Sequence, residues 1–137
     1  MFTRVPYTDL NSRQRENYNF HKFAARIADY GFNCIRLTDD WQGADFIAIH
    51  IDGETVLKVQ LKGRLIIDRK YIGKKIYIAF LNGDDAYLYD HDAFVRHLEV
   101  NGLIGDGSVS WHAQGFRSWP RPPAWAISYL QDFRISA

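Results

Sequence analysis

The sequence has 137 residues, of which 47% are hydrophobic and 15% aromatic, and it carries 17 basic against 16 acidic side chains. So many aromatic residues with so small a net charge exclude intrinsic disorder. No apolar run reaches the ~18–20 residues of a membrane span, and the first ten residues hold no apolar core of a secretory signal, so we expect no membrane partner. The single cysteine, Cys34, cannot form an internal disulfide, which favours a reducing, cytoplasmic location. We expect one domain over residues 1–137.

Charge is unevenly distributed along the chain. Residues 55–81 have a net charge of +6, and residues 82–106 have a net charge of −5. Because a polyanion responds to local potential more than to total charge, the basic stretch is a candidate surface for nucleic acid. Basic residues that merely keep an exposed strand edge soluble give the same pattern, so both interpretations stay open at this point.

An amphipathic helix is predicted between a cap at Asn11 or Ser12 and a stop at Gly31. Its face carries Glu16 one turn before the apolar stripe. A carboxylate on a core-facing stripe is costly unless it is paired, hydrogen-bonded or bound to a cation. The alternative interpretation is that Glu16 lies at a solvated end of the helix. The apolar stripe, at the spacing of one buried helix face, consists of Phe20, Phe23, Ala24, Ile27 and Ala28.

The rest of the chain reads mainly as short strands, which makes the expected fold class α/β with an N-terminal helix followed by a β-meander. After them, Asp90 caps a short helix, 108–112 is a further strand, and a last helix begins at Pro123. The main predicted strands cover 32–37, 45–51, 55–62, 76–81 and 86–89.

The pair Asp52-Gly53 between two strand patterns predicts a hairpin with a two-residue type I′ turn. That turn places Asp45 directly opposite Gln60, with both side chains on one face of the sheet. Lys62 shares this face because it lies two residues further along the same strand. A three-residue turn would shift the register by one and separate the three side chains.

These three polar side chains suit metal-dependent phosphate chemistry. Asp45 is a hard oxygen ligand for Mg²⁺, and Gln60 can add an amide oxygen. Lys62 can orient or deprotonate a water and offset charge on a phosphate. A hairpin with an ordinary solvated polar face is the alternative interpretation.

The chain resembles the PD-(D/E)xK nucleases, and more narrowly the small endonuclease-like domains in which Gln replaces the acidic residue before x-Lys. The resemblance covers residues 12–100 and leaves 101–137 as a C-terminal extension. It rests on Glu16 in a first helix, on Gly43-Ala44-Asp45 at the start of a strand, and on Val59-Gln60-Leu61-Lys62 at the end of the next.

The resemblance implies a restriction-endonuclease-like core, a mixed central β-sheet flanked by helices, which cuts the phosphodiester bonds of DNA with Mg²⁺ or Mn²⁺. Asp45 would be the main metal ligand and Gln60 the second. The carbonyl group of Leu61 would add a backbone ligand, and Glu16 would complete the set from the helix, directly or through water. Lys62 would serve the attacking water.

Two positions depart from the family pattern. Ala44 stands where proline is usual, which is commonly relaxed, and the neutral Gln60 removes one negative charge, which lowers affinity for a hard cation. A non-catalytic nucleic-acid-binding or assembly module is therefore the alternative function, and a homodimer is an arrangement that stays open. Salt-dependent contacts to the phosphate backbone are expected from Arg64, Arg69, Lys70, Lys74 and Lys75.

The segment 118–125 is rich in tryptophan and proline. It could stack on bases, dock a protein partner as an extended proline segment, or form a stiff loop that packs its two indoles onto the sheet.

Overall fold

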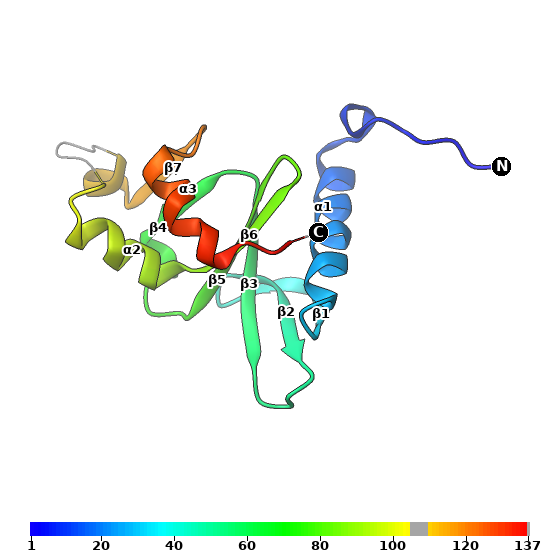
Figure 1. The fold of residues 1–137 in the computed structure, drawn as a ribbon, viewed down its shortest axis with the longest axis horizontal. Helices are drawn as coiled ribbons and strands as arrows, with labels where there is room; N and C mark the ends of the chain where they lie inside the picture. Colours follow the sequence, from blue (N-terminus) through cyan, green and yellow to red (C-terminus); the bar gives the residue numbers. More distant parts are fainter. Residues whose placement is uncertain (105–109, 137) are drawn as a thin grey trace.

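A computed structural model describes residues 1–104 and 110–136, so part of the strand expected at 108–112 lies outside the described residues. Figure 1 shows α1 on one side of a central sheet and α2 and α3 on the other. In the described residues no helix is long and apolar enough to cross a membrane. The elements are α1 (Ser12–Ala28), β1 (Phe32–Trp41), β2 (Ala44–His50), β3 (Val56–Lys62), β4 (Leu65–Asp68), β5 (Ile76–Asn82), β6 (Asp85–Asp90), α2 (His91–Val100), β7 (Phe116–Trp119) and α3 (Ala124–Leu130).

The central sheet has five strands in the order β1-β2-β3-β5-β6, and a second sheet pairs β4 with β7. Neighbouring strands of the central sheet are antiparallel except β3 and β5, which are parallel. The expected α/β class with a mixed sheet is confirmed, and a helix does precede the strands. The meander is limited to β1, β2 and β3, because β5 runs parallel to β3.

Helix α1 is built as its sequence predicts. Of the two candidate caps, Asn11 is the one used, since its side chain and that of Gln14 each accept a hydrogen bond from the other's backbone N–H at 2.9 Å. Gly31 has a φ of +85°, and a Cβ there would lie 2.9 Å from His50 Nε2, so this position needs glycine twice over. Phe20 packs edge-on against Phe46 of β2 with ring centroids 5.1 Å apart, which fixes α1 over the beginning of that strand.

The register of the β2–β3 hairpin agrees with the sequence prediction. Phe46 pairs with Val59, and the same register continues to a hydrogen bond of 2.9 Å from His50 N–H to the Thr55 carbonyl group. The predicted two-residue type I′ turn is wrong, because only Gly53 has positive φ and residues 51–54 form a longer loop. The four-residue loop is centred between Asp52 and Gly53, as the predicted turn is, so the strands keep the predicted register.

The C-terminal part packs back on both sides of the sheet. Leu65 of β4 pairs with Trp119 of β7, and the final helix starts after Pro123 as predicted. Residues 110–114 form a π-helical turn, so a strand is wrong for that part of 108–112. The N–H of Ile135 donates to the Ala86 carbonyl group at 2.8 Å, which ties the end of the described chain to β6 beside α1.

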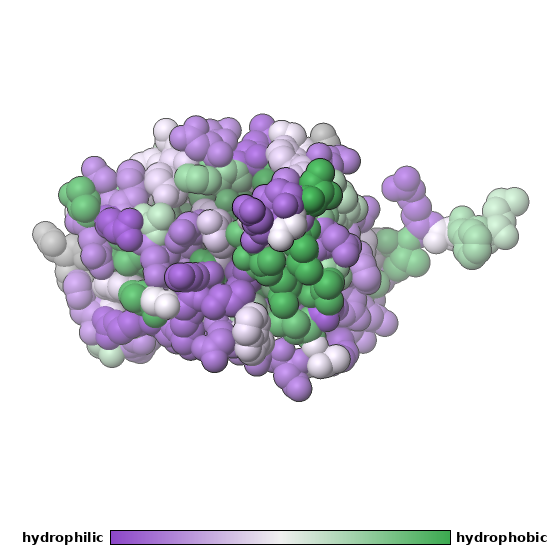
Figure 2. All heavy atoms as spheres, turned by 90° about the horizontal axis from the view of Figure 1, so that it is seen from below, coloured by the Kyte–Doolittle hydropathy of each residue, from purple (hydrophilic) through white to green (hydrophobic). Residues whose placement is uncertain are grey.

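One face of the hairpin remains open to solvent. Alternation along the strands turns Ile35, Ile47 and Val56 away from α1. Of these, Ile35 and Val56 are exposed, as is Ile51 in the hairpin loop. Figure 2 shows hydrophobic side chains gathered in a patch on this underside of the molecule.

Candidate functional site

Asp45, one residue into β2, is half-buried, and its carboxylate accepts a hydrogen bond from the backbone N–H of Leu61 at 3.0 Å. Burial raises the pKa of Asp45 above its ordinary value, and nearby Glu16 and Asp40 add to the rise. The Leu61 N–H and the positive charge of Lys62 act in the opposite direction and are outweighed. A carboxyl whose charged form is disfavoured in a cleft is a candidate functional group.

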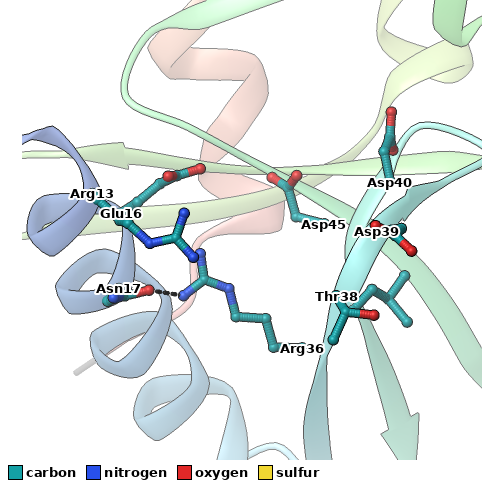
Figure 3. A pocket seen from close by; sticks show the side chains of 9 residues that line it. Arg13, Glu16, Asn17, Arg36, Thr38, Asp39, Asp40 and Asp45 are labelled. Carbon is teal, nitrogen blue, oxygen red and sulfur yellow. Dashed lines mark hydrogen bonds between the residues drawn. The ribbon is translucent and has the colours of Figure 1, made fainter.

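A cleft of about 580 Å³ opens between α1 and the beginning of β2. Glu16 lines it from α1 and Asp45 from β2, and Figure 3 shows their carboxylates pointing toward one another. Glu16 is exposed, so it sits on the solvated wall of the cleft while Asp45 lies at its base. The end of β1 contributes Asp39 and Asp40 to the same cleft.

A smaller recess of about 30 Å³ adjoins the cleft, and Glu16, Asp45 and Arg36 line both. Its other walls include the apolar side chains of Phe46 and Leu61. A volume of this size holds one water-sized occupant. Two carboxylates at such a space are oxygen ligands of the kind that a hard cation takes, and the guanidinium of Arg36 lines the same recess.

The two predicted residues on β3 take different places. Lys62 is close enough to lower the pKa of Asp45 by its charge, so it belongs to the surroundings of that carboxylate. Neither Gln60 nor Lys62 lines the cleft or the recess. The β2–β3 pairing ends at Phe46 and Val59, one position before the predicted pair of Asp45 and Gln60. The structure thus brings Asp45 and Glu16 together at the recess, and Lys62 acts on Asp45 through its charge.

The donor set fits a magnesium-like cation with few protein ligands. No group of three or more His, Cys, Asp or Glu residues suited to a metal is found in the part of the chain that the structure describes. Mg²⁺ is commonly held by one or two carboxylates and keeps several waters, so Asp45 and Glu16 meet that requirement. Of the two neutral donors predicted on β3, Leu61 lines the recess and Gln60 does not.

None of the five basic residues predicted to hold phosphate lines the cleft. Arg69 donates to the Trp111 carbonyl group at 2.9 Å and lies over the indole of Trp111, so its guanidinium helps to hold the C-terminal part of the fold. Lys70 is within 3.7 Å of Asp68. The remaining three, Arg64, Lys74 and Lys75, are exposed.

The tryptophans of the segment 118–125 pack into the protein. Trp119 is buried, and Trp125 meets it edge-on with ring centroids 6.0 Å apart. Pro120 and Arg121 between them are exposed. The loop interpretation accounts for both indoles.

The cleft also contains two residues that the sequence analysis did not single out, Arg13 and Arg36. Arg13 precedes Glu16 by three positions and so shares its side of α1, a signal that could have been read from the sequence. Arg36 pairs with Phe46, the neighbour of Asp45, through a β1–β2 register that no turn motif predicts.

Comparison with known proteins adds no relative. No protein family model matches the chain, and no curated protein matches it either.

Proposed function

We propose that this protein is a metal-dependent DNA endonuclease that hydrolyses phosphodiester bonds. The observation that carries the proposal is the facing pair of carboxylates, Glu16 and Asp45, with the charge of Lys62 beside them. The order of elements, α1 before the antiparallel β1, β2 and β3, then β5 parallel to β3, supports a restriction-endonuclease-like core. The two supports are independent, because one is the geometry of a site and the other is topology.

Asp45 and Glu16 would hold Mg²⁺ or Mn²⁺, with Gln60 and the Leu61 carbonyl group as neutral oxygen donors. When bound, the cation would draw charge away from the phosphate oxygens. Lys62 would position the attacking water and offset the charge that builds on the phosphate. The water oxygen adds to phosphorus, one P–O bond breaks and the departing oxygen takes up a proton, which leaves one phosphate end and one hydroxyl end.

The test is cleavage of supercoiled plasmid and of branched DNA with Mg²⁺, with Mn²⁺ and with EDTA. We expect cleavage with either cation and a loss of at least about 100-fold in Lys62→Ala, since removing one group that stabilises transition-state charge commonly costs this much. Lys22→Ala, on the exposed side of α1, is the matched control and should cut normally. A wild-type protein that never cuts, or a Lys62→Ala variant that cuts equally well, contradicts the proposal.

A second candidate function is a non-catalytic nucleic-acid-binding or assembly module. The neutral Gln60 favours it, as does the lack, in the described part of the chain, of any group of three or more His, Cys, Asp or Glu residues suited to a metal. This function predicts salt-sensitive DNA binding that is indifferent both to divalent cations and to Asp45→Asn. With either function, we also propose that the protein forms a homodimer or binds a protein partner through the segment 118–125.

A further inference from the structure

Two arginines enter the Asp45 cleft from facing walls. Arg13 comes from the first turn of α1, and Arg36 comes from β1 where its regular pairing with β2 ends. Figure 3 shows both guanidinium groups pointing into the cleft and toward each other. Two like charges that converge repel each other, and an anion between them would relieve that repulsion.

Neither arginine is neutralised by the carboxylates around it. Glu16, Asp39 and Asp45 line the same cleft, yet no ion pair within the described residues includes Arg13 or Arg36. Both guanidinium groups therefore keep their charge available to a ligand.

The two guanidinium groups are held to different degrees. Arg36 donates to the side-chain oxygen of Asn17 and lies 5.4 Å from the ring centroid of Phe20, which fixes its plane while most of its five N–H donors stay unused. Arg13 is exposed, and its side chain makes no hydrogen bond or ion pair with another described residue. One group is thus preorganised, and the other is free to close on a ligand.

We propose that Arg13 and Arg36 form a phosphate-binding site for the DNA backbone beside the Asp45–Glu16 pair. The planar fork of a guanidinium matches two oxygens of a phosphate, which a lysine ammonium cannot do. The inference rests on the proposed function. In it, the carboxylates act at the phosphate whose bond is cut, and the arginines bind the next phosphate along the DNA backbone. Since carboxylates outnumber arginines in the cleft, a divalent cation should strengthen DNA binding by lowering repulsion.

The test measures binding of the full chain to a fluorescein-labelled DNA duplex by fluorescence anisotropy, over a series of salt concentrations, with Ca²⁺ and with EDTA. We expect Arg13→Gln and Arg36→Gln each to raise Kd several-fold and to lower the slope of log K against log salt by about 0.9 for each phosphate that the variant no longer neutralises. Arg96→Gln, an exposed arginine of α2 outside the cleft, is the matched control and should bind normally. Ca²⁺ should lower the Kd of the wild type.

Arg36 also packs against α1, so Arg36→Lys and a melting curve for each variant distinguish weaker phosphate binding from a failure to fold. A folded Arg36→Lys variant with weakened binding supports the need for the fork. The proposal is overturned if the wild type does not bind the duplex, if both Gln variants keep its affinity and salt slope, or if Arg96→Gln loses as much. A wild type that cuts DNA while both variants bind normally would leave the nuclease standing without this site. A wild type that never cuts while both variants bind poorly would leave the site standing without the nuclease.

Discussion

The carboxylate of Asp45 and the backbone N–H of Leu61 lie 3.0 Å apart, which fixes the start of β2 to the end of β3. The bond holds the acid beside the peptide that joins Gln60, Leu61 and Lys62. Even so, burial raises the pKa of Asp45, so the folded protein carries a charged group at a cost. Such a cost is typical of a site kept for function rather than for stability.

Replacing Asp45 by Asn should stabilise the protein at neutral pH. The folded chain keeps the Asp45 proton to higher pH than the unfolded chain, so the native state loses stability as pH rises above the ordinary pKa of 3.8 toward the raised value. Asn removes this loss and can still accept the Leu61 hydrogen bond. We expect the melting temperature of Asp45→Asn to exceed that of the wild type by a few degrees at pH 7, and the difference to shrink below pH 4.

Asp9→Asn, at an exposed position before α1, is the control for removing one negative charge. The charge of Asp45 does not cause the higher melting temperature if the two variants melt at the same temperature at pH 7. The same holds if the increase in melting temperature of Asp45→Asn is as large below pH 4 as at pH 7.

Replacing Gln60 by Glu should strengthen cation binding at the Asp45 site. Affinity for a hard cation rises with the number of charged oxygen ligands, and Gln60, one position beyond the Phe46–Val59 pair of the hairpin, offers only a neutral amide. We expect Gln60→Glu to bind Mn²⁺ about tenfold more tightly, which corresponds to about 1.4 kcal/mol. Binding is measured from the rise in melting temperature during an Mn²⁺ titration, and removal of the cation with EDTA should reverse it.

Gln131→Glu, an exposed position after α3, controls for the added charge. Equal Mn²⁺ affinity in Gln60→Glu, Gln131→Glu and the wild type would place Gln60 outside the cation site, in keeping with its absence from the lining of the recess.

The sequence predicted the half of the site that depends on one short loop. The Asp52-Gly53 signal centres the hairpin, so the predicted register holds from Ile49–Val56 to Phe46–Val59 even though the turn has a different shape. The predicted pair of Asp45 and Gln60 lies one position past the end of this pairing. The stripe of α1 likewise predicted the side of the helix on which Glu16 lies, and the exposure of Glu16 agrees with the alternative of a solvated helix end. Both predictions use local periodicity, which a single sequence contains.

The other half depends on contacts that no local pattern encodes. The β1–β2 register shifts between Arg36 and Trp41. The position of Arg36 relative to Asp45 and the cleft therefore could not be predicted from the sequence between them. The pairing of β4 with β7 joins Leu65 to Trp119 across 54 positions. Arg69 is exposed as a surface cation should be, but its contact with Trp111, 42 positions away, is one that no local pattern indicates.

Cys34 should be a slowly reacting thiol. Burial raises its pKa from 9.0 to about 11, so at pH 8 only about one thiol in a thousand is ionised. The thiolate formed at high pKa is a better nucleophile, which recovers part of the difference. We expect alkylation by iodoacetamide at pH 8 to be at least about tenfold slower in the native protein than in the urea-unfolded chain, measured by mass spectrometry. Equal rates would mean that Cys34 is not held in β1 as the structure has it.

Ile135 should contribute most to stability among the residues at the C-terminal end of the described chain. Its side chain is 9% exposed and belongs to the apolar cluster between α1 and the sheet, whereas Ile51 in the hairpin loop is 86% exposed. Ile135→Ala removes buried methyl groups and leaves a cavity, so we expect it to lower the free energy of unfolding by about 2–3 kcal/mol. Ile51→Ala makes the same chemical change in solvent and should stay within about 0.5 kcal/mol of the wild type. Urea unfolding measures both as shifts of the midpoint at constant m-value. If both variants unfold at the urea concentration of the wild type, the packing of Ile135 against α1 and β6 contributes nothing to the native state.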